Sequence, residues 1–201
     1  MRLFIALDID DVIRERIVRF VEAVSGFAPD ARWARPESLH VTLKFIGEQP
    51  EPMLEEIKRA LGTVAGAVTL QFRGYGFFPT TKAPRVFWIG IDSGPELATL
   101  AAAVDQRTSR LGIPKEERSF SPHLTLARGA RGGARGATSS GSPHRRKEDG
   151  PNRNFHRLQE KLAALPTPEF GTMTAHEFFL YQSELGRGGS RYTKLSRFAL
   201  K

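Results

Sequence analysis

The chain has 201 residues, of which 40% are hydrophobic and 26% charged, as in ordinary globular proteins. It contains no cysteine, which excludes disulfides, zinc–thiolate sites, iron–sulfur clusters and cysteine nucleophiles. The net charge of +8 favours a polyanionic partner such as nucleic acid, although a general solubility charge explains it equally well. The apolar run at the N-terminus is too short for a signal peptide, so we expect a cytoplasmic monomer without membrane spans.

The first half of the chain predicts alternating strands and helices. An apolar strand over Leu3–Leu7 precedes a helix over Asp11–Val24, in which apolar residues recur at helical spacing. Asp8, Asp10 and Asp11, between these elements, fit helix capping better than a metal site. The elements that follow are a strand over Leu39–Ile46, a helix over Met53–Val64, and strands over Val68–Phe72 and Arg85–Ile91 around a turn-rich connection, Gly74–Pro84.

The second half repeats this alternation. Its predicted elements are helices over Glu96–Leu111 and Phe155–Leu165, and strands over His123–Ala127, Thr172–Gln182 and Tyr192–Leu200, the last two joined by a turn at Gly186–Ser190. The order predicts an α+β fold, a single domain over residues 1–201 with two similar antiparallel halves.

Two tetrads share one pattern, in which a histidine, an apolar residue, a threonine and an apolar residue follow one another. They are His40-Val41-Thr42-Leu43 and His123-Leu124-Thr125-Leu126. On a strand, successive side chains point to opposite faces, so the histidine and threonine share one face and the aliphatic pair packs in a core. A single tetrad is more often structural than functional, whereas two copies in strand contexts favour a function.

A pair of histidines suits the opening of a cyclic phosphodiester. One neutral imidazole activates water on one side of phosphorus, and one protonated imidazole protonates the departing ribose oxygen on the other. The hydroxyls of Thr42 and Thr125 can donate hydrogen bonds to the non-bridging oxygens as charge develops on them. This chemistry requires neither a metal nor a cofactor, and we expect none.

These motifs resemble the twin His-x-Thr-x signatures of the 2H phosphoesterases, and most of all those of the RNA 2′,3′-cyclic phosphodiesterases, also described as 2′-5′ RNA ligases. The likeness includes Arg2–Leu7, Trp33–Gly47, Ser121–Arg128 and Tyr181–Ser183 with Arg191-Tyr192. It implies a bilobal fold whose central cleft carries both motifs, with helices outside, and hydrolysis of cyclic RNA ends to 2′-phosphomonoesters. By resemblance, His40 is the proton donor, His123 the proton acceptor, and Arg128 a phosphate contact.

Three other functions remain open. The chain could carry out 2′-5′ RNA ligation or hydrolyse a small cyclic phosphate, or it could be a non-catalytic nucleotide- or RNA-binding module. The intact histidines and threonines argue against a pure binding module, because binding alone needs no proton-transfer pair.

Residues outside the motifs carry weaker expectations. Arg35, Lys44 and Arg191 are further candidates for phosphate contacts. Strand alternation places Lys44 on the side of His40, although a solvated position for Lys44 is equally consistent with the sequence. The same alternation places Phe45 in the core. Three other histidines, His144, His156 and His176, have no matching partner and are interpreted as structural or surface residues.

A segment rich in glycine, serine and arginine, Gly129–Asn152, departs from the family pattern. It holds few large apolar residues and has a net charge of +3, from five basic and two acidic residues. We expect a flexible insertion, because such a composition cannot bury enough surface to offset its ordering entropy. It either holds an RNA backbone non-specifically or has no role.

Overall fold

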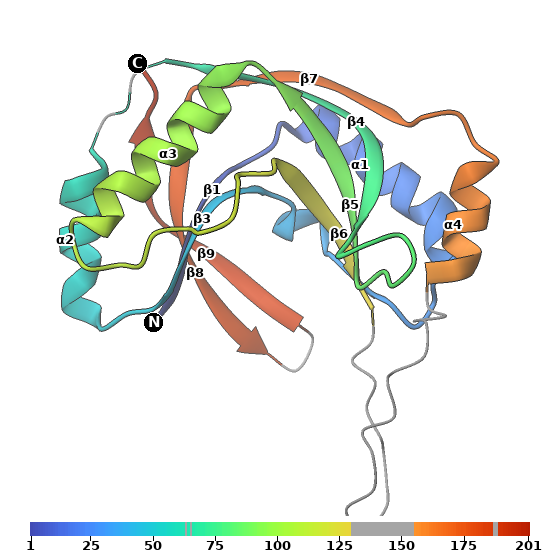
Figure 1. Ribbon diagram of the computed structural model, residues 1–201, viewed down its shortest axis with the longest axis horizontal. Helices are drawn as coiled ribbons and strands as arrows, with labels where there is room; N and C mark the ends of the chain where they lie inside the picture. The colour runs from blue at the N-terminus through green and yellow to red at the C-terminus, as the bar shows by residue number, and fades with distance from the viewer. Residues whose placement is uncertain (63, 65, 130–154, 187–188) are drawn as a thin grey trace, which may run out of the picture.

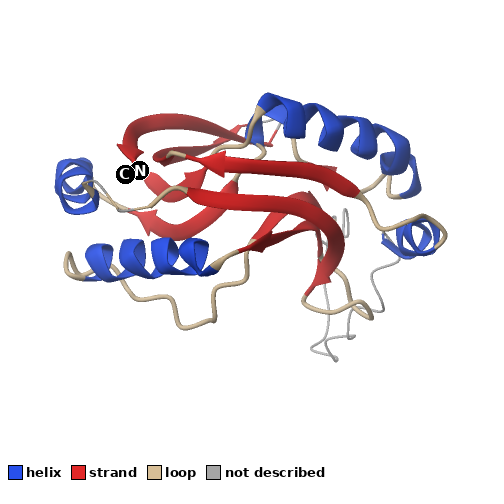
Figure 2. Ribbon diagram, turned by 90° about the horizontal axis from the view of Figure 1, so that it is seen from above, coloured by secondary structure: helices blue, strands red, loops and turns tan. Residues whose placement is uncertain are grey.

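The computed structural model describes residues 1–62, 64, 66–129, 155–186 and 189–201. Two sheets lie at its centre, and the helices cover them from outside (Figures 1 and 2). The strands are β1 (Arg2–Leu7), β2 (Arg32–Trp33), β3 (Val41–Glu48), β4 (Val68–Phe78), β5 (Val86–Ser93), β6 (His123–Arg128), β7 (Glu169–Ala175), β8 (Glu177–Gly186) and β9 (Gly189–Ala199). The α-helices are α1 (Asp11–Val24), α2 (Glu51–Leu61), α3 (Pro95–Ser109) and α4 (His156–Ala163).

The strands divide into a four-stranded sheet, in the order β3-β1-β8-β9, and a five-stranded sheet, in the order β2-β6-β5-β4-β7. Neighbouring strands within each sheet run antiparallel. The predicted α+β fold with two antiparallel halves is thus confirmed.

The same strand–helix–strand unit occurs once in each sheet. In the first, β1 is followed by α1, by the short β2 of the other sheet and then by β3, which pairs with β1. In the second, β5 is followed by α3 and then by β6, which pairs with β5. The helices bridge the halves, because α1 packs on β7 of the five-stranded sheet and α3 packs on β3 of the four-stranded sheet as well as on β4 of its own. These contacts join the two sheets.

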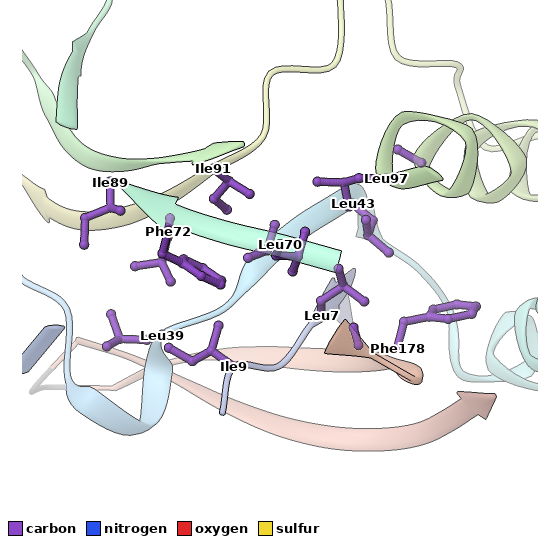
Figure 3. Packing of buried hydrophobic residues seen from close by; sticks show 14 of the residues in the cluster. Leu7, Ile9, Leu39, Leu43, Leu70, Phe72, Ile89, Ile91, Leu97 and Phe178 are labelled. Atoms are coloured by element: carbon purple, nitrogen blue, oxygen red, sulfur yellow. The ribbon is translucent and has the colours of Figure 1, made fainter. Parts of the chain in front are cut away.

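A single hydrophobic cluster therefore extends through both halves. Figure 3 shows Leu7 and Leu43 of the four-stranded sheet packed in the same cluster as Phe72 and Ile89 of the five-stranded sheet. The apolar face predicted for α1 is buried through Ile13, Ile17 and Val24. None of the helices in the described part is both long and apolar enough to span a membrane.

The prediction of one strand over Thr172–Gln182 is wrong. The segment contains two strands of different sheets, which separate at the exposed His176. β7 alternates between buried and exposed residues, whereas Phe178, Phe179, Leu180 and Tyr181 of β8 are all buried. β8 has this continuous buried run because apolar residues cover both of its faces, and a run of apolar residues does not mark the change of sheet.

The connection predicted over Gly74–Pro84 is in part a strand. β4 continues to Phe78, because an irregularity in its pairing with β5 lies between Phe72 and Tyr75 and Gly74 adopts a positive φ of 69°. The β8–β9 hairpin is confirmed by pairing that runs down to Gly186 and Gly189, and residues 187–188 lie outside the described part. The predicted insertion, Gly129–Asn152, lies outside the described residues except for Gly129. Gly129 donates its N–H to the Arg85 carbonyl oxygen.

Candidate active site

A serine carbonyl holds each motif histidine in one orientation. Nδ1 of His40 lies 2.7 Å from the carbonyl oxygen of Ser38, and Nδ1 of His123 lies 2.7 Å from that of Ser121. Because a carbonyl oxygen only accepts, Nδ1 carries the hydrogen in both rings. Nε2 is then the proton-accepting nitrogen of each neutral imidazole. A serine precedes each histidine by two residues in the sequence, but the paired motifs alone do not predict this contact.

Side chains alternate within both motifs as predicted. The threonine of each motif shares the partly exposed side with the histidine, while the two aliphatic side chains are buried. The partly exposed residues are His40, Thr42, His123 and Thr125, and the buried ones are Val41, Leu43, Leu124 and Leu126.

The two motifs are close in space although they belong to different sheets. β3 and β6 contact each other, and the Ala34 N–H, just before the first motif, donates to the Leu126 carbonyl oxygen at 2.7 Å. The positive charge of a protonated His123 lowers the pKa of His40. Each imidazole therefore lies within electrostatic range of the other.

Both imidazoles have pKa values below the ordinary value for histidine. Burial lowers the pKa of His40 to about 4, with smaller contributions in the same direction from the charges of Arg128 and His123. The hydrogen bond to Ser38 and the charge of Asp8 oppose this shift. Burial also lowers the pKa of His123, and Arg128 adds to that effect. The guanidinium of Arg128 therefore acts on both imidazoles, as a phosphate contact of this site would.

A bulge follows the threonine of each motif. In the pairing of β1 with β3, Ala6 faces Thr42 and Ile5 faces Lys44, which leaves Leu43 as an extra residue. In the pairing of β5 with β6, Trp88 faces Thr125 and Phe87 faces Ala127, which leaves Leu126 as the extra residue. A one-residue bulge reverses the alternation beyond it. The residue five positions after each histidine, Phe45 or Arg128, therefore returns to the side of the imidazole.

The first of these bulges makes two expectations wrong. Lys44 is 5% exposed and neither solvated nor on the side of His40, and Phe45 is 61% exposed instead of lying in the core. The Lys44 ammonium is ion-paired with Asp105 of α3 and donates a hydrogen bond to the Pro114 carbonyl oxygen at 2.8 Å. A buried ammonium requires such partners.

Aromatic side chains surround His40. The ring centroid of Phe4 lies 4.8 Å from that of His40, Tyr192 lies 5.2 Å away with its ring nearly perpendicular, and Tyr181 lies 6.1 Å away. Phe4 and Tyr181 are themselves stacked at 5.0 Å. Burial raises the pKa of Tyr181, so its hydroxyl stays protonated at neutral pH. These rings come from β1, β8 and β9, far apart in sequence, and the tetrad pattern carries no signal for them.

His123 has an aromatic environment of its own. Phe78 lies 4.9 Å from it edge-on, and Trp88 lies 6.1 Å from it. The indole of Trp88 lies across Gly76, where an added Cβ would come within 2.1 Å of the ring. Gly76 is therefore needed for this close packing. This group was not predicted, because Gly76 and Phe78 fall in the segment Gly74–Pro84, which was expected to be a connection.

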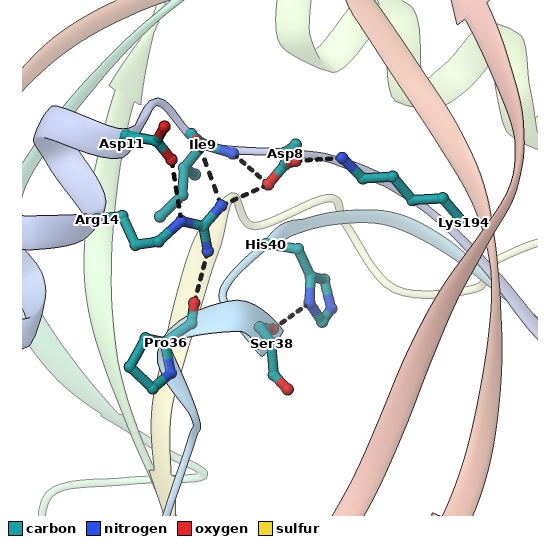
Figure 4. A network of polar contacts seen from close by, with 8 residues as sticks. All are labelled: Asp8, Ile9, Asp11, Arg14, Pro36, Ser38, His40 and Lys194. Atoms are coloured by element: carbon teal, nitrogen blue, oxygen red, sulfur yellow. Dashed lines mark hydrogen bonds and ion pairs between the residues drawn. The ribbon is translucent and has the colours of Figure 1, made fainter.

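Asp8 is the centre of a polar network beside His40 (Figure 4). Its carboxylate accepts hydrogen bonds from the Ile9 N–H at 2.9 Å, from Arg14 at 2.7 Å and from Lys194 at 2.5 Å. Burial raises the pKa of Asp8, but these three donors outweigh it and the pKa is lowered. The capping prediction is wrong for the side chains, because Asp10 at the N-cap of α1 makes no side-chain capping hydrogen bond. Asp11 instead forms an ion pair with Arg14.

The remaining predicted residues lie away from the motifs or make other contacts. His156 is exposed on α4 and pairs with Glu160, His176 is exposed between β7 and β8, and His144 lies outside the described residues. Arg35 forms an ion pair with Glu37, and Arg191 is exposed on β9. Within the described ranges, no group of three or more histidine, aspartate or glutamate side chains is arranged to hold a metal ion.

Comparison with known proteins identifies the family. The family model described as LigT-like phosphoesterase matches residues 7–88. The chain is 39% identical to an RNA 2′,3′-cyclic phosphodiesterase of Archaeoglobus fulgidus over 64% of its own length and 72% of the relative. It is 30% identical to the protein of that name from Methanothermobacter thermautotrophicus over 100% of its length and 99% of the relative.

Solved structures agree with this result. The crystal structure of Escherichia coli LigT complexed with 3′-AMP matches 99% of this chain and 97% of that one, with a TM-score of 0.73 and 29% identity. The resemblance to the 2H phosphoesterases is thereby confirmed. The chain belongs to the family of LigT-like phosphoesterases.

Proposed function

We propose that the protein hydrolyses RNA 2′,3′-cyclic phosphodiester ends to 2′-phosphomonoesters by general acid and base catalysis. One observation carries this proposal. Two imidazoles, on strands of different sheets that contact each other, have the same tautomer, set by the carbonyl oxygens of Ser38 and Ser121, and the charge of His123 lowers the pKa of His40. The relatives named RNA 2′,3′-cyclic phosphodiesterase, of which one spans the whole chain, support the substrate.

In the proposed reaction, a water oxygen attacks phosphorus in line with the leaving O3′ atom. Nε2 of His123 takes a proton from this water, and Nε2 of His40 gives a proton to O3′ as the bond between phosphorus and O3′ breaks. The products are a 2′-phosphomonoester and a 3′-hydroxyl. The assignment of His40 as proton donor follows the resemblance, since the two motifs have nearly the same geometry.

Three further residues are proposed to stabilise the transition state. The hydroxyls of Thr42 and Thr125 donate to the non-bridging phosphate oxygens, whose negative charge grows as the five-coordinate phosphorus forms. The guanidinium of Arg128 neutralises part of the same charge, which its influence on the pKa values of both histidines supports. The scheme requires no cofactor.

Turnover of an oligonucleotide with a 2′,3′-cyclic phosphate end tests this proposal. His40→Ala and His123→Ala are each expected to lower kcat by about 10²–10⁴, because each removes one proton transfer. His176→Ala, which removes an exposed histidine away from both motifs, should retain full activity and serves as the matched control.

The assay contains EDTA and separates 2′-phosphate from 3′-phosphate products, and thermal unfolding verifies that each variant is folded. Full activity in either motif variant would refute the mechanism. A 3′-phosphate product would refute the assignment of O3′ as the leaving atom. Joined oligonucleotides in place of a phosphomonoester would favour the ligase alternative.

A further inference from the structure

Arg32 is directly opposite Arg128 at the edge of the five-stranded sheet. β2 is the outermost strand of this sheet and consists of Arg32 and Trp33 alone. Its pairing with β6 places Arg32 against Arg128 and Trp33 against Ala127. Directly opposite residues of an antiparallel pair point to the same face of a sheet, so both arginines project from one side.

That side is the one on which the His123 imidazole lies. Trp33 packs into the core, with its ring 5.9 Å from that of Phe87, and donates its indole N–H to the Ala28 carbonyl oxygen at 3.1 Å. Ala127 is buried as well. Because side chains alternate along a strand, Arg32 and Arg128 point away from the core. Beyond the bulge in β6, Arg128 lies on the side of the His123 imidazole, so Arg32, directly opposite Arg128, adjoins the same site.

Two exposed arginines at directly opposite positions repel each other and destabilise the pairing of their strands. In the described part of the chain, neither Arg32 nor Arg128 forms an ion pair with a carboxylate. The anchored indole of Trp33 nevertheless fixes the register of this two-residue strand. An arrangement that concentrates positive charge beside a phosphate site suits a ligand with more than one phosphate.

We propose that Arg32 binds the phosphodiester that joins the terminal nucleotide of the RNA to the preceding one, while Arg128 contacts the cyclic phosphate. This inference rests on the proposed function and adds a preference for RNA chains over mononucleotides. Neighbouring strands lie about 4.8 Å apart, so Arg32 is one strand farther than Arg128 from His123. Since β2 is the edge strand, the rest of the RNA can continue past it into solvent.

The test compares two substrates, a trinucleotide with a 2′,3′-cyclic phosphate end and a mononucleotide 2′,3′-cyclic phosphate. Arg32→Gln is expected to lower kcat/KM about tenfold for the trinucleotide, because one charge-assisted contact is lost. It should leave kcat/KM for the mononucleotide unchanged. The salt dependence of trinucleotide binding should become shallower by about 0.7 in log–log slope. The matched control is Arg110→Gln, which replaces an exposed arginine at the end of α3 and should leave kcat/KM unchanged for both substrates.

If Arg32→Gln lowered kcat/KM equally for both substrates, the inference would be overturned, since Arg32 would then act at the terminal phosphate. An unchanged kcat/KM for both substrates would overturn the inference as well. Fluorescence anisotropy with a labelled trinucleotide that ends in a 2′-phosphate measures the contact without turnover. If the wild-type protein hydrolyses neither substrate, the proposed function fails, and this binding measurement still decides whether Arg32 holds the RNA.

Discussion

The surroundings of His40 determine the charge of its imidazole. Burial lowers its pKa to about 4, so the ring is neutral at pH 7 in the free protein, whereas a proton donor must carry a proton when the leaving oxygen departs. We propose that the negative charge of the bound cyclic phosphate raises this pKa, in the same way as the carboxylate of Asp8 already does.

The lowered pKa of His40 also predicts how stability depends on pH. In the unfolded chain the ring titrates near 6.5, so between pH 6.5 and 4 the unfolded state binds more protons than the native state. The free energy of unfolding should therefore fall as pH falls through this window, by up to about 1.4 kcal/mol per pH unit for one such group. Burial of His123, which also lowers its pKa, acts in the same direction.

Urea unfolding at pH 4.5, 5.5, 6.5 and 7.5 measures this dependence. His40→Gln removes the titrating group, so its stability should change less steeply with pH across the window than that of the wild-type protein. Equal slopes for His40→Gln and the wild-type protein would show that the native pKa of His40 is not lowered.

At the scale of single elements, Lys44 connects β3, which carries the first motif, to the segment that precedes the second motif. Its ammonium pairs with Asp105 of α3 and also binds the Pro114 carbonyl oxygen, while Asp105 accepts the Glu116 N–H at 3.0 Å. Burial raises the pKa of Asp105, but the hydrogen bonds from Lys44 and Glu116 outweigh it and the pKa is lowered.

Lys44→Met should lower the free energy of unfolding by about 2–4 kcal/mol, because it leaves a partly buried carboxylate without its cation. Lys58→Met, which breaks an exposed pair with Glu55, should cost less than about 1 kcal/mol. Denaturant unfolding of Lys44→Met, Asp105→Leu and the double variant forms a cycle. Additive effects would show that the two residues do not stabilise each other.

Sequence patterns predicted the elements better than the details within them. The alternation in His40-Val41-Thr42-Leu43 is correct up to Leu43 and fails for Lys44 and Phe45, because a bulge inserts one residue that no periodic pattern contains. The serines that orient the histidines could have been found, since both precede their histidine by two residues. Phe4, Tyr181 and Tyr192 fall in stretches that resemble the family, but their place around His40 could not be predicted, because only tertiary packing brings β1, β8 and β9 together there.

At the scale of the whole molecule, the bridging helices predict that the two sheets unfold together. α1 follows a strand of the four-stranded sheet and packs on the five-stranded one, and α3 follows a strand of the five-stranded sheet and packs on both. Neither sheet can therefore lose its core without exposing that of the other. Both tryptophans, Trp33 and Trp88, belong to the five-stranded sheet. Their fluorescence therefore reports on that half, whereas far-UV circular dichroism reports on the whole chain.

Leu180→Ala, in the centre of the four-stranded sheet, tests this cooperativity. Leu180 is fully buried, so its truncation should lower the free energy of unfolding by about 2–5 kcal/mol. If the sheets unfold as one unit, the fluorescence midpoint in urea shifts as far as the circular dichroism midpoint, although no tryptophan lies in the altered sheet. A fluorescence midpoint that stays at the wild-type value would mean that the halves unfold separately. The core that the two sheets share would then not couple their unfolding.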